Sequence, residues 1–326
     1  MSLAHADSSA PITPASAERL WSKRNLLMAI AVGTAAFFFY SFVLYNYYYG
    51  DPAHYQRFYD SLVGRDVIWA LLSQRDYLGS SEFIYPIVAW MGSNAFIERY
   101  VFMAAFSGLM YGALFNALRS FRCHPIFIAL SLTNFYVVVL ATSAERLKFA
   151  YIFLFLALMA AGRTKLLWMA LAPLAHFQSL ITHGSILIWH FFAHLSARVK
   201  VAIGVSAAIS AMALLYFFYG ALLDKFAAYR GQGGLIDILS GMALVGIALA
   251  IFQNRVRVFM TFAPLIALTF ILGSDRMNMV TFTSFLYICL IEKKTNHPAV
   301  LLVMVYFSIK AIEFIDNVLK YGNGFV

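Results

Sequence analysis

Long apolar stretches, separated by short polar segments, run along almost the whole of this chain. A helix needs about 20 apolar residues to cross the roughly 30 Å of hydrocarbon in a bilayer. Nine stretches approach or reach that length, at 25–47, 97–117, 125–143, 147–162, 201–219, 234–252, 257–272, 277–291 and 297–315. Their recurrence predicts an all-α, polytopic integral membrane protein with about nine full spans.

The apolar tract at 166–195 does not fit a single crossing. Basic pairs flank it on both sides, Arg163/Lys165 before it and Arg198/Lys200 after it. If both flanks lie on one side of the membrane, the tract must cross an even number of times, and two full helices would need roughly 40 residues. We therefore expect a re-entrant pair of half-helices, or two short tilted helices, turning near His176-Phe177-Gln178-Ser179. The total then becomes 9–11 helices.

Basic residues gather in alternate polar segments, which sets the expected orientation. They precede the first stretch as Arg19, Lys23 and Arg24, and recur as Arg119/Arg122, Arg163/Lys165, Arg198/Lys200, Arg255/Arg257 and Lys293/Lys294. Lys and Arg are enriched in cytoplasmic segments of membrane proteins. The N-terminus is therefore expected to be cytoplasmic, and the intervening polar segments are expected to face the outside.

The domain organisation follows from the same pattern. Residues 1–20 are rich in Ala, Ser and Pro and are expected to form a disordered cytoplasmic N-terminus. Residues 21–326 are expected to form a single transmembrane helical domain. Its main outer segment is 48–96, whose aromatic and polar composition is typical of interfacial helices that cap a bundle. A second outer loop is expected at 220–233.

Composition excludes a soluble globular domain. Hydrophobic residues make up 62% of the chain and charged residues only 12%, against roughly 25% charged in soluble domains. The net charge of +9 is explained by cytoplasmic flanks and does not indicate nucleic-acid binding. Neither HExxH nor CxxC, the Walker motif, GxGxxG or GxSxG occurs, so the sequence predicts no metal and no cofactor.

Three residues interrupt apolar sequence where a bilayer disfavours ionisable groups: Arg146, His176 and Arg276. Such groups cost roughly 2.5–3.5 kcal/mol on insertion scales and usually mark a site. The predicted orientation puts both arginines at the outer boundary. Guanidinium groups bind phosphate through paired hydrogen bonds, so two outer arginines are suited to a diphosphate. His176 is a candidate catalytic group at the predicted turn.

A simpler interpretation exists for each of these residues. Arg146 could belong to a helix-end cluster with Glu145 and Lys148 whose charges reach toward water. Asp275 could pair with Arg276 in the same way. His176 could be a hydrogen-bonded core residue, and the outer carboxylates Glu82 and Asp51 could simply be solvated.

Several short motifs, taken in order, resemble the EpsG-like branch of the Wzy-type bacterial polysaccharide polymerases. They are Gly50-Asp51 with Tyr55 and Tyr59, Ser81-Glu82-Phe83, Glu145-Arg146-Leu147-Lys148-Phe149-Ala150, Leu174-Ala175-His176-Phe177-Gln178-Ser179, Lys225-Phe226-Ala227-Ala228-Tyr229 and Asp275-Arg276-Met277-Asn278. Together they cover most of residues 45–290. In that family a Gln commonly follows the arginine, whereas Leu147 stands here.

The resemblance implies an inner-membrane glycosyltransferase with a GT-C-like bundle and helices in its outer loops. Such enzymes join oligosaccharide repeat units carried on undecaprenyl diphosphate at the periplasmic face, for O-antigen, capsule or exopolysaccharide. It implies a flippase and a chain-length regulator as partners. The residues expected to act in catalysis are His176, Glu82, Arg146 and Arg276; those expected to bind substrate are Asp51, Gln178, Tyr229, Arg230 and Asp275.

Three other classes compete with this interpretation. A GT-C-type glycosyltransferase that uses a polyprenyl-phosphate sugar would add one sugar only, with Asp51 or Asp60 as its acidic motif. A lipid-linked oligosaccharide flippase would move the substrate without changing it. A membrane O-acyltransferase also uses histidine and arginine.

Overall fold

The computed structural model describes residues 23–79, 81–194, 196, 199, 235–272 and 274–325. For 190–194, 235–238, 270–272 and 274–276 it describes the backbone alone. Across these ranges the chain is all-helical, with 14 α-helices and no strand. The predicted all-α class is therefore confirmed for the described part. The predicted span at 201–219 and the outer loop at 220–233 lie outside it.

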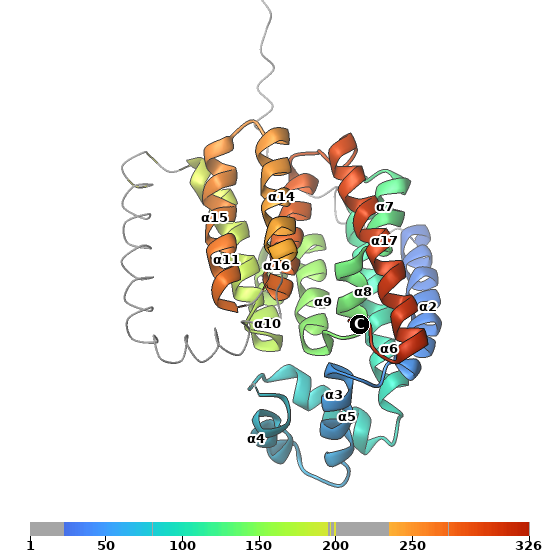
Figure 1. Ribbon diagram of the computed structural model, residues 1–326. Coiled ribbons are helices and arrows are strands. Elements are labelled where there is room, and N and C mark those ends of the chain that lie inside the picture. The colour runs from blue at the N-terminus through green and yellow to red at the C-terminus, as the bar shows by residue number, and fades with distance from the viewer. Residues whose placement is uncertain are drawn as a thin grey trace, which may run out of the picture. The chain divides into compact units, whose positions relative to one another are not determined.

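The helices divide into two compact units, each described by itself (Figure 1). Unit 1 comprises Met1–Phe177 and Leu301–Val326. Its helices are α2 (Lys23–Asn46), α3 (Asp51–Ser61), α4 (Val67–Leu78), α5 (Ile84–Asn94), α6 (Arg99–Ser120), α7 (Pro125–Leu132), α8 (Phe135–Ala141), α9 (Glu145–Met159), α10 (Gly162–Ala175) and most of α17 (Pro298–Tyr321). Unit 2, Gln178–Val300, contains α11 (Ser179–His194), α14 (Leu235–Ile251), α15 (Arg255–Leu272) and α16 (Ser274–Ile291).

Three of the described helices, α2, α6 and α17, are long and apolar enough to cross a membrane. Shorter apolar helical segments occur at Ser179–Trp189, Leu239–Ile251 and Met277–Ile291. Several apolar helices are thus present, as a membrane protein requires.

The tract at 166–195 is broken where the sequence predicts a turn. Helix α10 ends at Ala175 and α11 begins at Ser179. His176 between them has an extended backbone, with φ −158° and ψ 123°. The apolar stretch at 125–143, in contrast, is not the single helix that was predicted. It forms α7 and α8, because Asn134 interrupts it and its side chain caps α8 by accepting a hydrogen bond from the Tyr136 N–H.

The segment 48–96, which is predicted to lie on the outer side, forms three helices, α3, α4 and α5. Asp66 caps α4 by accepting a hydrogen bond of 2.7 Å from the Trp69 N–H, and Gly79 ends it in the left-handed conformation. Figure 1 shows the three helices gathered at one end of the longer helices of unit 1. Tyr59 on α3 fastens this cap by donating a hydrogen bond to the Ile97 carbonyl just before α6.

Glycines hold α2 and α6 at close range in unit 1. A Cβ atom built on Gly108 would lie 2.6 Å from the Gly33 carbonyl oxygen, and one on Gly33 would lie 2.8 Å from the Gly108 oxygen. One turn further along α6, a Cβ atom on Gly112 would meet the backbone of Ala29, which lies one turn earlier on α2 than Gly33. The two helices therefore run antiparallel. Small residues four apart allow such backbone contact between apolar helices. The antiparallel packing places Lys23 and Arg24 at the end of α6 that carries Arg119, away from the cap.

Substitution of Gly108 by alanine should therefore lower stability. The added methyl group would meet backbone atoms that cannot move aside, and we expect a loss of roughly 1–3 kcal/mol. The matched control is Gly246→Ala in α14, where a Cβ would meet nothing within 4 Å; there the better helix propensity of alanine should leave stability unchanged or higher. Unfolding of the purified protein in detergent measures both. A Gly108→Ala protein as stable as the control would contradict the close contact.

Candidate functional site

Glu82 lies between the two predicted catalytic groups Arg146 and His176. One carboxylate oxygen is 3.3 Å from the Arg146 Nη1 and the other is 3.5 Å from the His176 Nε2. The three side chains come from separate segments: the loop before α5, the first turn of α9, and the residue that ends α10. Their exposed fractions are 7% for Glu82, 14% for Arg146 and 18% for His176. The cluster is therefore partly buried but still reachable from outside.

The position of Glu82 is fixed by α4 and α10. Gln74 on α4 is fully buried, and its Nε2 donates a hydrogen bond of 3.2 Å to the Glu82 carboxylate. The same amide accepts a bond of 2.8 Å from the Glu82 backbone N–H. The next residue, Phe83, donates its N–H to the Leu174 carbonyl on α10 at 3.2 Å. Glu82 is thus held by its backbone as well as by its side chain.

Arg146 also contacts Tyr55 on α3. Its Nε donates to the Tyr55 hydroxyl at 3.4 Å, and its guanidinium carbon lies 5.9 Å from the ring centroid. Burial raises the pKa of Tyr55 to about 12, although the Arg146 charge opposes this shift. The Tyr55 hydroxyl therefore stays protonated at neutral pH. The exposed Asp51 lies one turn earlier on α3 and also raises the pKa of Tyr55.

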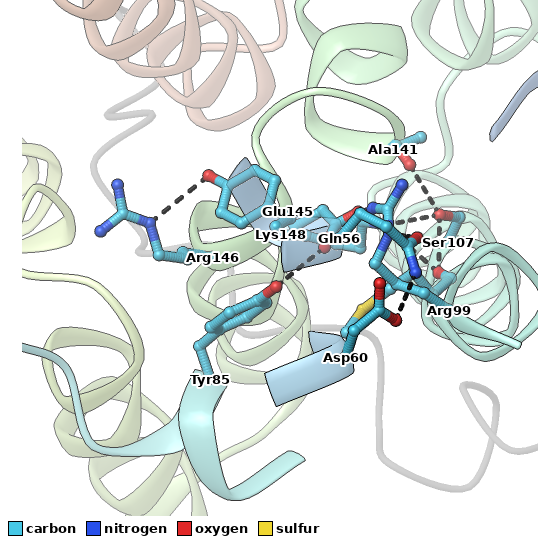
Figure 2. Close-up of polar contacts among 11 residues, drawn as sticks. Gln56, Asp60, Tyr85, Arg99, Ser107, Ala141, Glu145, Arg146 and Lys148 are labelled. Carbon is cyan, nitrogen blue, oxygen red and sulfur yellow. Dashed lines mark hydrogen bonds and ion pairs between the residues drawn. The ribbon is translucent and has the colours of Figure 1, made fainter. Parts of the chain in front are cut away.

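A buried network of charged side chains lies on the other side of α9 from Arg146 (Figure 2). Glu145, the residue before it, forms an ion pair with Arg99 at the start of α6, and both side chains are almost fully buried. The Tyr85 hydroxyl donates to the other Glu145 oxygen at 3.0 Å. Arg99 extends the network to α3, since its Nε donates to the Gln56 Oε1 at 2.7 Å. Three helices, α3, α5 and α6, are thereby tied to α9.

Lys148 adds a second buried cation one turn further along α9. It is fully buried, and its Nζ donates to the Ser107 hydroxyl at 2.8 Å and to the Met103 carbonyl at 3.2 Å. Ser107 in turn donates to the Ala141 carbonyl at the end of α8. Figure 2 shows Lys148 and Glu145 directed toward α6, with Arg146 on the other side of α9. The first turn of α9 is therefore fixed on several sides, which holds the Arg146 backbone in place.

The structure brings three of the four predicted catalytic residues together, Glu82, Arg146 and His176. Gln178 lies in unit 2, where its carbonyl accepts the Ile181 N–H at the start of α11. Asp275 and Arg276 lie in the first turn of α16, where the backbone alone is described. Tyr229 and Arg230 lie outside the described residues. The roles of all these residues remain predictions.

The simpler interpretation of Arg146, a helix-end cluster with Glu145 and Lys148 that reaches toward water, is wrong about the contacts of Glu145 and Lys148. Glu145 pairs with Arg99 and does not neutralise its neighbour Arg146. Lys148 does not reach toward water, since its side chain is wholly enclosed. The cause is the geometry of a helix, in which successive side chains point about 100° apart. Glu145 faces α6, whereas Arg146 faces Glu82.

Sequence reasoning missed several residues of this site. Arg99 carries a signal that could have found it, because it is an arginine at the outer end of the apolar stretch 97–117. Lys148 is likewise a charge inside an apolar run. Gln74 and Tyr85 carry no such signal, since a polar amide and a tyrosine are ordinary in an outer segment.

Comparisons of the chain with protein-family models, with curated proteins and with solved structures found no match. Within the described residues, no group of three His, Cys, Asp or Glu side chains is placed to hold a metal ion. The side chains of the cluster offer a cation, a carboxylate and an imidazole.

Loss of the Glu145 charge should strongly destabilise unit 1. The Glu145→Gln variant leaves Arg99 buried without its counter-charge, which costs roughly 3–5 kcal/mol for a buried pair. Asp316→Asn is the matched control, because it breaks an exposed pair with Lys320, which water screens and which should contribute little to stability. Unfolding in detergent compares the two. Equal stability of both variants would mean that the buried pair does not anchor α9.

Proposed function

We propose that this protein is a polytopic inner-membrane glycosyltransferase of the Wzy type. In this proposal it joins oligosaccharide repeat units carried on undecaprenyl diphosphate at the outer face of the membrane. The observation that carries the proposal is the convergence of Arg146, Glu82 and His176 at one end of the helices of unit 1, beneath the cap of α3 to α5. An anionic lipid-linked substrate would meet a cation and a proton acceptor at the same place.

The distribution of basic residues supports the orientation. Lys23, Arg24 and Arg119 share the end of unit 1 away from the cap, and Arg163 and Lys165 begin α10 whereas His176 ends it. Basic residues favour the cytoplasmic side. The capped end that carries the cluster would then face the periplasm, where the lipid-linked units are polymerised in the family that the sequence resembles.

The proposed reaction transfers a growing chain to a sugar hydroxyl. The bond between the anomeric carbon of the chain and the diphosphate oxygen breaks, and that carbon bonds to the acceptor oxygen. The acceptor proton passes to His176, and Glu82 stabilises the imidazolium that forms. The lipid diphosphate leaves with the bonding electron pair. Arg146 would stabilise its developing charge.

Glu82 would have a second role before substrate binds. Its contacts with Arg146 of 3.3 and 3.5 Å are longer than the 2.7–2.9 Å of a tight charge-assisted hydrogen bond. A diphosphate, which carries more charge, could replace the Glu82 carboxylate at so long a contact with the Arg146 guanidinium. Displacement would leave the Glu82 carboxylate with Gln74 and His176, and binding of the donor would thereby prepare the base.

Loss of the Arg146 guanidinium should abolish polymerisation. We expect Arg146→Ala to lower turnover by about 100-fold or more, as does removal of one group that stabilises transition-state charge. Arg75→Ala is the control, because it removes an exposed arginine of the same outer segment. Purified protein in vesicles receives lipid-linked repeat units, and gel electrophoresis displays the products.

The wild-type protein should produce a ladder of repeats, as should Arg75→Ala. A ladder from Arg146→Ala would overturn the role of this arginine. A single added sugar in the wild type would support the GT-C-type alternative, and transport of an unchanged unit would support the flippase.

Substitution of Glu82 by glutamine should separate binding from turnover. Removal of the competing carboxylate should tighten binding of undecaprenyl diphosphate about tenfold, equivalent to ~1.4 kcal/mol. Turnover should nevertheless fall roughly 100-fold or more, because the proton acceptor loses its charged partner. Ligand binding and initial rates measure the two effects. Weaker binding together with slower turnover would show that Glu82 only supports the fold.

A further inference from the structure

Tyr55 is a buried side chain of the candidate site that has no part in the reaction proposed above. It lies on α3, is 5% exposed, and its hydroxyl accepts a hydrogen bond of 3.4 Å from the Arg146 Nε. Its ring centroid lies 5.5 Å from that of Tyr85, whose hydroxyl is bonded to Glu145. Contacts at the hydroxyl and at the ring therefore both hold Tyr55 next to Arg146.

The chemistry of the guanidinium decides the direction of the hydrogen bond between Arg146 and Tyr55. A guanidinium carries five N–H donors and no acceptor, whereas a phenol hydroxyl can both donate and accept. The Tyr55 oxygen must therefore be the acceptor, and its own proton is directed to another group. Among the described residues, Arg146 is the only hydrogen-bond partner of Tyr55. The hydroxyl thus keeps a proton to donate, at a position that Arg146 fixes.

Tyr55 and Glu82 contact different nitrogens of the same guanidinium. Tyr55 lies at the Nε of Arg146, whereas the Glu82 oxygens lie 3.3 and 3.5 Å from its Nη1. The two nitrogens are bonded to the same carbon, so a group that replaces the Glu82 carboxylate comes close to the Tyr55 hydroxyl. A diphosphate carries oxygens on two phosphorus atoms and can reach both places at once.

The Tyr55 hydroxyl can donate a hydrogen bond to a phosphate without losing its proton. Burial raises the pKa of Tyr55 to about 12, whereas a phosphate group loses its second proton at a pH of about 6. The phosphate oxygen is therefore a far weaker base than the phenolate, and the proton stays on Tyr55. A donor that is held in place beforehand stabilises charge on a leaving group without having to reorganise.

We propose that Tyr55 is a further catalytic residue, whose hydroxyl donates a hydrogen bond to the departing lipid diphosphate while Arg146 binds its charge. This inference rests on the proposed function, because it assigns a second contact to the same leaving group. Arg146 on α9 supplies the charge, and Tyr55 on α3 supplies a neutral, directed donor. No covalent bond to Tyr55 forms or breaks.

Replacement of Tyr55 by phenylalanine removes the donor and keeps the ring. We expect Tyr55→Phe to weaken binding of undecaprenyl diphosphate roughly tenfold and to lower turnover about 100-fold, because the hydrogen bond strengthens as charge develops on the leaving group. Binding to the purified protein in detergent, and initial rates in vesicles that contain lipid-linked repeat units, measure the two effects.

Tyr77→Phe is the matched control. Tyr77 belongs to the same cap, is 37% exposed and packs against the rings of Phe58 and Trp69. Loss of its hydroxyl should leave both binding and turnover unchanged. A Tyr55→Phe protein that binds and polymerises as well as this control would overturn the role of Tyr55.

A fluorinated tyrosine at position 55 distinguishes donation to the substrate from support of Arg146. Fluorine makes the phenol a better hydrogen-bond donor and a poorer acceptor. At a pH at which the phenol is still protonated, Tyr55→3-fluorotyrosine should bind undecaprenyl diphosphate at least as tightly as the wild type and should react at least as fast. Weaker binding and slower turnover would mean that Tyr55 serves only as the acceptor for Arg146, which would overturn the proposal.

The two measurements separate this inference from the proposed function. If the wild type binds undecaprenyl diphosphate and makes a ladder of repeats, and Tyr55→Phe does the same, Tyr55 has no catalytic role and the polymerase proposal stands. If the wild type neither binds undecaprenyl diphosphate nor makes polymer, both proposals are overturned.

Discussion

The candidate site depends on one buried ion pair, between Glu145 at the start of α9 and Arg99 at the start of α6. A buried charge without a partner is so unfavourable that the two helix ends must stay together. Tyr85 from α5 and Gln56 from α3 bond to the same pair, so the outer cap is tied to it as well. The orientation of Arg146 follows from this anchor, because it is the next residue of α9.

Much of the fold could be predicted from the sequence because apolar length and charge act over whole segments. The break of the tract at 166–195 near His176 is an example, since thirty residues between basic flanks cannot make two full crossings. The break at Asn134 was missed for the opposite reason. There the cause is one side chain that caps α8, and a single asparagine does not change the average hydropathy of a stretch.

The site could be predicted only in part. Arg146 and His176 were identified as ionisable groups in apolar sequence and Glu82 as a carboxylate of the predicted outer segment, but nothing in the sequence shows that Glu82 bridges the other two. That arrangement depends on Gln74, which bonds to both the backbone and the side chain of Glu82. Likewise the partner of Glu145 proved to be a residue 46 positions away. Pairing between distant residues is set by helix packing, and local charge patterns favour the wrong neighbour.

The adjacent residues Glu145 and Arg146 show how one helix end can combine stability with chemistry. Since neighbouring side chains on a helix diverge by about 100°, one of the two charges can be buried while the other remains at a partly open surface. Glu145 is fully enclosed and its contacts are tight, whereas Arg146 retains some exposure and its contacts with Glu82 are long. A rigid anchor beside a partly exposed cation suits the anion-binding site that we propose. In the proposed function, the anchored backbone of α9 would stay in place while an anionic group of the substrate replaces the Glu82 carboxylate at Arg146.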